Sequence, residues 1–395
     1  RGKMVFNRTS EQWEYVQGYW TAREIWQQPV TWRKTLKLVK EQKEALQAFI
    51  DQVLEQPDFE IILSGAGTSE FIGNALYSYL GMKSGHRVRS YGTTDIVASP
   101  ENYLNKDKPT LMISYGRSGN SPESVAAVEC ANMVCDRIWH LFVTCNHDGA
   151  LSRYAQGRDN CYALNLPEET HDQSFAMTSS FTNMYLATLG VFNLDKYEQF
   201  EHRIREVIER VEELTDSDHE MIKAVIDDYD LKRIVYLGSN TNKGIAQESA
   251  LKMCELTAGK VVTVFDTPMG FRHGPKSVID DDTLTVIYMS DDPYTRQYEV
   301  DLLKEMASQR KGNRLMVLMG QEDEEIRELA DYVYCFNNEH QLENVLLGME
   351  YIVVAQLMAM YKSLSLNITP DNPCPSGEVN RVVKGVVIYP YGGQS

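Results

Sequence analysis

The alternation of apolar and polar residues between positions 110 and 134 predicts a strand that leads into a helix. Residues 110–114, TLMIS, form a short apolar, β-prone run, and residues 122–134, PESVAAVECANMV, carry apolar side chains at helical spacing. Ser121 stands directly before Pro122, which is the usual order of a helix N-cap and the first helical residue. A turn rich in glycine and serine, GRSGNS, therefore joins the two predicted elements.

Another strand–turn–helix pattern occurs once in each half of the chain. Residues 61–76, IILSGAGTSEFIGNAL, superpose on residues 234–249, IVYLGSNTNKGIAQES, with Gly65 aligned to Gly238. In both segments an apolar strand is followed by a Gly/Thr turn and a helix. The repetition predicts two α/β units of about 150 residues each.

The two halves also share their later elements. Residues 140–165 match residues 314–337, and both are typical of a strand, an acidic turn, a helix and a strand. Strands that alternate with helices indicate parallel sheets, whose ligands bind beyond the carboxyl ends of the strands. We therefore predict an α/β fold with two tandem domains, each a parallel sheet flanked by helices in a flavodoxin-like three-layer arrangement.

The repeats also predict how the chain divides. Before the first repeat the sequence is helical and aromatic, with four of the five tryptophans. The predicted parts are an N-terminal helical segment at 1–55, a first α/β domain at 56–195, a linking helix at 196–230, a second α/β domain at 231–365, and a C-terminal tail at 366–395 that contributes to the site.

Composition and charge limit the kinds of partner that the chain is expected to bind. The chain has 395 residues and a net charge of −17, so we expect it to bind neither nucleic acid nor an anionic membrane surface. We also expect no membrane span, because no apolar run approaches the roughly 20 residues that a span needs. The seven cysteines are scattered and form no C-x-x-C, which favours reduced thiols and a cytoplasmic location.

No cofactor or metal is expected. The turn GAGTSEFIG at 65–73 is not the dinucleotide fingerprint G-x-G-x-x-G, because its third glycine, Gly73, falls three positions late. The eight histidines form no H-x-H or H-x-x-x-H pair, so the sequence offers no dedicated metal site.

The turn between residues 116 and 121 instead suits an anion. The first N–H groups of the following helix lack backbone partners, the helix dipole is positive there, and serine hydroxyls add donors. The same turn is also compatible with a purely structural link between strand and helix. The residues alone leave both interpretations open.

Four short motifs, in this order, give the chain a family resemblance: GAGTS, RSGNS, ESALKMCE and RHGP, at 65–69, 117–121, 248–255 and 272–275. The chain resembles the sugar isomerase (SIS) superfamily, with two SIS domains in tandem over about 56–365. The arrangement is similar to the isomerase half of glucosamine-6-phosphate synthase. The segments FAMTSSFT and TPDNPCPSGEVNRVVKGVVIYP, at 175–182 and 369–390, more specifically resemble the AgaS family of galactosamine-6-phosphate deaminases and tagatose-6-phosphate ketose/aldose isomerases.

The resemblance implies that the anion is a sugar phosphate. The residues it assigns to phosphate binding are Ser69, Ser118, Ser121, Thr178 and Ser179. Arg117 departs from the pattern, because the synthases have glutamine there. It either pairs with the phosphate as a planar fork or lies solvated on the turn, and both alternatives stay open.

The motif ESALKMCE places Glu248, Lys252 and Glu255 on one helix face, at i, i+4 and i+7. Such a face is either a solvated charged stripe or a buried catalytic surface. The apolar neighbours of the three residues favour burial. The resemblance implies that Glu255 transfers the proton, and Glu248 is the next candidate.

Two further catalytic residues are implied only by the resemblance. His273 lies in the loop GFRHGP and matches the histidine that opens the sugar ring in the synthases. Because that histidine reaches the site of the neighbouring subunit, a homodimer with a shared active site is implied. Lys384, in RVVKGVVIY, falls where the synthase tail has a lysine that contacts the open-chain sugar.

The function expected from these residues is conversion of galactosamine 6-phosphate into tagatose 6-phosphate and ammonia, by ring opening and proton transfer between C2 and C1. One alternative is a ketose/aldose isomerase that performs the same proton transfer without deamination. The other is a non-catalytic SIS protein that senses a sugar phosphate. Such a sensor usually carries a DNA-binding helix-turn-helix and has no need for Glu255 and His273.

Overall fold

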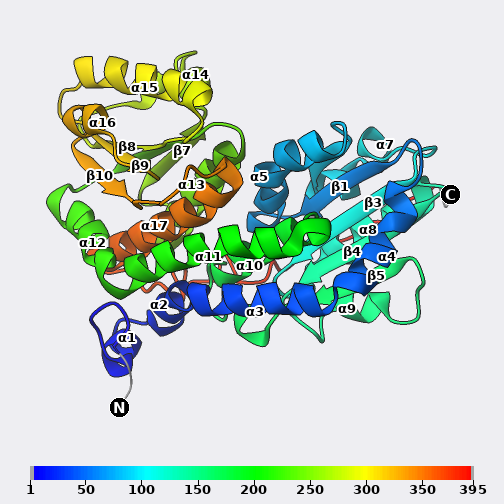
Figure 1. Ribbon diagram of the computed structural model, residues 1–395. Coiled ribbons are helices and arrows are strands. Elements are labelled where there is room, and N and C mark those ends of the chain that lie inside the picture. Colours follow the sequence, from blue (N-terminus) through cyan, green and yellow to red (C-terminus); the bar gives the residue numbers. More distant parts are fainter. Residues whose placement is uncertain (1–3, 393–395) are drawn as a thin grey trace. The chain divides into compact units, whose positions relative to one another are not determined.

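The computed structural model describes residues 4–392 and divides into two compact units. The first unit contains residues 30–173, 177–201 and 376–392. The second unit contains residues 4–29, 174–176 and 202–375. Each unit is built around one sheet, and Figure 1 shows both.

The sheet of the first unit has five strands in the order β2-β1-β3-β4-β5, and every pair is parallel. All residues of the two central strands β1 and β3 are buried, as expected of a parallel sheet covered on both faces. The strands are β1 (Glu60–Gly65), β2 (Val88–Gly92), β3 (Thr110–Gly116), β4 (Ile138–Thr144) and β5 (Cys161–Asn165).

The helices of the first unit follow its strands in alternation. Ser121 is the N-cap of α8 and Pro122 its first residue, so the predicted helix start is confirmed. The helical segments are α4 (Lys43–Leu54), α5 (Thr68–Lys83), α6 (Thr93–Ala98), α7 (Pro100–Tyr103), α8 (Pro122–Val134), α9 (Ala150–Ala155), η1 (Glu168–Thr170), α10 (Ser179–Val191) and η2 (Leu194–Lys196).

The second unit repeats the topology, with the parallel order β10-β9-β8-β6-β7. Numbered within each sheet, both orders are 2-1-3-4-5, which is the flavodoxin-like arrangement. The predicted duplication and fold class are therefore confirmed. The strands are β6 (Arg233–Leu237), β7 (Val262–Asp266), β8 (Thr283–Tyr288), β9 (Arg314–Met319) and β10 (Tyr332–Cys335).

The remaining helices belong to the second unit or run across the boundary between the units. Within the second unit lie α1 (Ser10–Tyr15), α2 (Tyr19–Trp26), the π-helical turn η3 (Leu214–Asp218), α12 (His219–Asp228), α13 (Thr241–Leu256), α14 (Pro268–Phe271), η4 (Pro275–Val278), α15 (Pro293–Ser308), α16 (Glu324–Leu329) and α17 (Asn344–Ser365). The two helices at the boundary are α3 (Gln28–Glu41) and α11 (Tyr197–Glu213).

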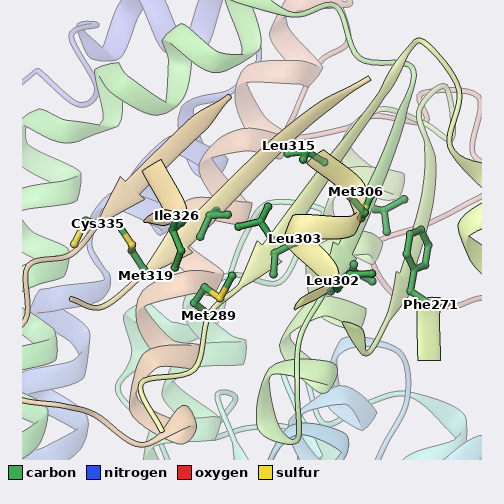
Figure 2. Close-up of a cluster of buried hydrophobic side chains, with 13 residues drawn as sticks. Phe271, Met289, Leu302, Leu303, Met306, Leu315, Met319, Ile326 and Cys335 are labelled. Carbon is green, nitrogen blue, oxygen red and sulfur yellow. The ribbon is translucent and has the colours of Figure 1, made fainter. Parts of the chain in front are cut away.

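One core cluster of the second unit shows why its strands are apolar along their whole length. Figure 2 shows Leu302, Leu303 and Met306 of α15 in one buried cluster with Leu315 and Met319 of β9. All five are buried, and burial of each such side chain stabilises the fold by about 1.5–3 kcal/mol. The packing fixes the strands, and with them the turns at their carboxyl ends.

One helix passes the length and composition test for a membrane span. Among residues 4–392 this is α17, with a mean hydropathy of 1.4. The expectation that no apolar run is long enough is therefore wrong. However, 94% of the apolar 18-residue stretch of α17 that passes the test is buried inside the protein. Such burial is typical of a core helix.

Candidate active site

The turn after β1 is a tight Gly/Thr/Ser turn in the first unit. A Cβ atom at Gly65 would lie 2.6 Å from the backbone carbon of Ser69, and Gly67 has φ 57°, so both positions require glycine. Thr68 and Ser69 open α5 and are buried. The turn thus brings Ser69 to the start of a helix at the carboxyl edge of the sheet.

The turn after β3 carries three of the predicted phosphate-binding residues. Gly119 adopts φ 66°, which lets the chain reverse between β3 and α8. The Ser118 hydroxyl accepts a hydrogen bond from the Asn120 N–H (3.1 Å), and the hydroxyls of Ser121 and Ser124 are hydrogen-bonded to each other (2.6 Å). Ser118 and Ser121 are both half-buried, so their hydroxyls lie at the surface of the turn.

Arg117 does not lie solvated on this turn. Its exposed fraction is 7%, and its Nη2 atom donates a hydrogen bond to the backbone oxygen of Arg381 in the C-terminal segment (2.9 Å). The solvated alternative is therefore wrong, because Arg117 is buried and hydrogen-bonded to the tail. Its pairing with phosphate stays a prediction.

Thr178 and Ser180, which flank Ser179 at the start of α10, are held by a residue that the sequence did not single out. The carboxylate of Asp172 accepts hydrogen bonds from the backbone N–H groups of Thr178 and Ser180 (2.8 Å each) and from both hydroxyls. Asp172 is fully buried, and burial raises its pKa even though the Ser180 bonds and the charge of Arg117 act the other way. In the sequence, the signal that could have found Asp172 was an acidic residue six positions before a serine-rich helix start.

Lys384 belongs to the same unit as these turns. Its side chain is exposed, and it follows Arg381, which contacts Arg117, by three residues. Three extended residues span at most about 11 Å. The first unit thus contains all the predicted phosphate-binding residues and the tail that carries Lys384: Ser69, Arg117, Ser118, Ser121, Thr178 and Ser179.

The acidic face of α13 lies in the second unit. The Lys252 Nζ atom is 3.1 Å from Glu248 Oε1 and also donates to Glu255 Oε1. Glu248 and Lys252 are fully buried, whereas the Glu255 side chain is 22% exposed. The solvated-stripe alternative is therefore wrong. Burial lowers the pKa of Lys252, but the two carboxylates outweigh it and raise that pKa overall.

His273 lies in the second unit just after α14. Its backbone N–H donates to Gly270 O (3.0 Å), and its side chain is exposed. The following Gly274 has φ 113°, which favours glycine and turns the chain away after the histidine. The loop therefore presents the imidazole at the surface of its unit.

The corresponding turns of the second unit hold a carboxylate of the same chain. Glu299 of α15 accepts hydrogen bonds from the Ser239 hydroxyl (2.7 Å), the Ser290 N–H (2.7 Å) and the Ser290 hydroxyl (2.8 Å). Ser239 follows β6 and Ser290 follows β8, so these donors occupy places equivalent to the first unit's turns. In the second unit, a carboxylate of the chain itself therefore occupies these donors.

No metal centre is found in the part of the chain that the structure describes. Among residues 4–392, no group of three or more His, Cys, Asp or Glu side chains is arranged to hold a metal ion.

Comparison with known proteins identifies relatives along nearly the whole chain. The SIS domain family model matches residues 54–194 and 229–365. A D-galactosamine-6-phosphate deaminase AgaS from Shewanella sp. (strain ANA-3) is 44% identical, over 97% of this chain and 95% of its own. The crystal structure of tagatose-6-phosphate ketose/aldose isomerase from Escherichia coli is 40% identical with a TM-score of 0.88, over 95% of this chain and 98% of its own.

A more distant similarity matches the expected relation to the synthases. Glutamine–fructose-6-phosphate aminotransferase (isomerizing) from Clostridium acetobutylicum is 24% identical over 67% of this chain and 43% of its own.

Proposed function

The chain belongs to the SIS domain family, and we propose that it converts galactosamine 6-phosphate into tagatose 6-phosphate and ammonia. The observation that carries this proposal is the 44% identity to a D-galactosamine-6-phosphate deaminase over nearly the full length of both chains. The buried charged face of α13 supplies the acid–base chemistry that such a reaction needs.

The phosphate is bound by donors of the first unit. Ser69 lies at a helix start, Ser118 lies on the turn before α8, and Ser121 is the N-cap of α8. Hydroxyl groups beside the unpaired N–H groups of helix starts suit a multiply charged anion. Thr178 and Ser179, at the start of α10, act with them.

The reaction itself moves one proton and exchanges one nitrogen for oxygen. After His273 assists ring opening, Glu255 removes the C2 proton of the open-chain aldehyde, and an enolamine forms. Return of a proton to C1 gives an imine at C2, which water hydrolyses to the ketone with release of ammonia. Lys252 orients the Glu255 carboxylate through its hydrogen bond, and Lys384 contacts the open-chain sugar.

A homodimer with a shared active site follows from the role of His273. The exposed side chain of this residue is free to serve the site of a second copy. A cytoplasmic location agrees with the seven cysteines, all of which are free thiols within the described residues.

Isomerisation without deamination is the second candidate, because the related Escherichia coli structure bears the name of a tagatose-6-phosphate ketose/aldose isomerase. The two functions are separated by incubating the protein with galactosamine 6-phosphate, glucosamine 6-phosphate and tagatose 6-phosphate. Release of ammonia from galactosamine 6-phosphate is the expected result. Conversion of tagatose 6-phosphate to an aldose, without ammonia release from either amino sugar, would instead identify an isomerase.

A further inference from the structure

We propose that Arg117 and Asp172 are positioning residues that fix the C-terminal segment 376–392, and with it Lys384, against the turns that hold the phosphate. The role of Lys384 rests on the proposed function, whereas the anchoring itself does not. The inference gives Arg117 a task other than binding phosphate.

Asp172 joins two segments of the first unit. Its carboxylate holds the start of α10 through Thr178 and Ser180, as described above. Its backbone oxygen accepts a hydrogen bond from the Arg381 guanidinium. One fully buried residue therefore connects the start of α10 with the C-terminal segment.

Arg117 completes the connection from the other side. Its guanidinium donates to the Arg381 backbone oxygen (2.9 Å), and its charge partly opposes the rise that burial causes in the pKa of Asp172. Arg381 thus donates to Asp172 through its guanidinium and accepts from Arg117 through its backbone oxygen. The two bonds lock residue 381 to the turn after β3 and to the segment before α10.

The segment is held a second time beyond Lys384. Residues 386–391 line a surface hollow of about 660 Å³ together with Thr94, residues 97–102 and Glu123 of α8. Tyr391 packs against the core cluster that contains Ile62 and Met112. Lys384 therefore lies on a short bridge, residues 382–385, between residue 381 and residues 386–391.

The bridge has little structure of its own. Residues 376–392 form no helix or strand, and Val383, Lys384 and Val387 are exposed. Few buried contacts and no regular backbone hydrogen bonds are the features of a segment that opens locally. Loss of the anchor at residue 381 should free the bridge while the rest of the unit stays folded.

The decisive variant is Arg117→Gln, which removes the charge and the fork but keeps a polar side chain. Limited trypsin digestion, followed by mass spectrometry, measures cleavage after Lys384. We expect cleavage about ten- to a hundredfold faster than in the wild type, the factor that corresponds to loss of a charged hydrogen bond. Inhibition by inorganic phosphate should stay within about twofold, because the serine donors remain.

The same variant tests whether Arg117 acts through Lys384. Arg117→Gln should lower kcat by about tenfold or more with little change in KM. In a Lys384→Ala background the same substitution should lower kcat by less than about threefold, because the lysine it positions is already gone. Arg117→Lys restores the charge without the fork and should recover only part of kcat.

Two variants guard against a misleading result. Arg381→Ala removes the bond to Asp172 from a half-buried side chain, and it should also speed trypsin cleavage after Lys384 even if Arg117→Gln fails to fold. Arg296→Gln, which breaks the 3.0 Å pair with Asp323 in the second unit, is the matched control. It should change neither cleavage nor phosphate inhibition.

A residue that binds phosphate would behave differently from one that holds the C-terminal segment. If Arg117→Gln weakens phosphate inhibition by tenfold or more and trypsin cleavage stays at the wild-type rate, Arg117 binds phosphate and the proposal is wrong. If no sugar phosphate is turned over, the proposed function fails, but the digestion and phosphate measurements still decide the anchoring.

Discussion

The Nζ atom of Lys252 lies 3.1 Å from Oε1 of Glu248, and both side chains are fully buried in the second unit. The two residues are one helical turn apart on α13, and the third member of the face, Glu255, is partly exposed. A buried ammonium between two carboxylates orients both of them. The partly exposed member is the one open to solvent, which supports the proposal that Glu255 transfers the proton.

Replacement of Glu255 by glutamine should remove the basic carboxylate and keep the shape of the side chain. We expect kcat and kcat/KM to fall together by about 10²–10⁴, the usual contribution of a positioned general base. Folding and phosphate affinity should survive. Steady-state kinetics on galactosamine 6-phosphate measure the loss, and near-normal turnover would remove Glu255 from the mechanism.

Glu248→Gln is the control for that experiment. It should lower the free energy of unfolding by about 3 kcal/mol, because breaking a buried ion pair leaves Lys252 less well compensated. Glu255 remains beside the ammonium, so the cost stays at the low end of the range for such pairs. Urea denaturation should therefore respond more to Glu248→Gln, and kcat more to Glu255→Gln.

Phosphate binding should depend on the serines of the first unit. Ser118→Ala and Ser121→Ala each remove a donor to a charged ligand, so KM should rise about ten- to a hundredfold. Ser290→Ala, at the equivalent turn of the second unit, removes a bond to Glu299 and should leave KM unchanged. Unphosphorylated galactosamine should bind poorly to every form, and wild-type KM in both first-unit variants would make their turn structural.

The proposed homodimer predicts complementation between inactive subunits. His273→Ala and Glu255→Gln should each be inactive alone, and mixing them should restore part of the activity because some hybrid sites are intact. Light scattering measures the oligomeric state in parallel. An active monomer would contradict the shared site.

Stability should fall with rising pH because of Glu350 on α17. This carboxyl is fully buried, and burial raises its pKa well above the usual 4.5. The hydrogen bond from the Asn338 amide (2.8 Å) and the charge of Arg210 lower the pKa in part, whereas the charges of Asp291 and Glu206 raise it further. The folded state therefore retains a proton that the unfolded chain loses above about pH 4.5, so this contribution to stability is lost as pH rises through the folded pKa.

Glu350→Gln removes the titration and keeps an amide of similar shape. Urea midpoints at pH 5 and pH 8 should differ less in this variant than in the wild type, and the variant should be relatively more stable at pH 8. An unchanged pH dependence would show that Glu350 is ionised in the folded protein.

The sequence by itself determined the features that depend on neighbouring residues. The repeated strand–turn–helix patterns predicted both parallel sheets, and Ser121 with Pro122 marked the start of α8, as the structure has it. The spacing of Glu248, Lys252 and Glu255 placed them on one helix face, where they are hydrogen-bonded. These outcomes follow from backbone geometry, which is the same wherever the segment lies in the fold.

Only the tertiary structure decided what each side chain meets. Arg117 is buried and bonds to a tail residue more than 250 positions later, and no local pattern encodes that contact. Glu299 fills the second unit's turns because α15 brings it back to Ser239, sixty residues away in sequence. The apolar run of α17 is enclosed by protein for the same reason. Burial and partners are set by contacts between distant segments, so the sequence could name these residues' chemistry but not their neighbours.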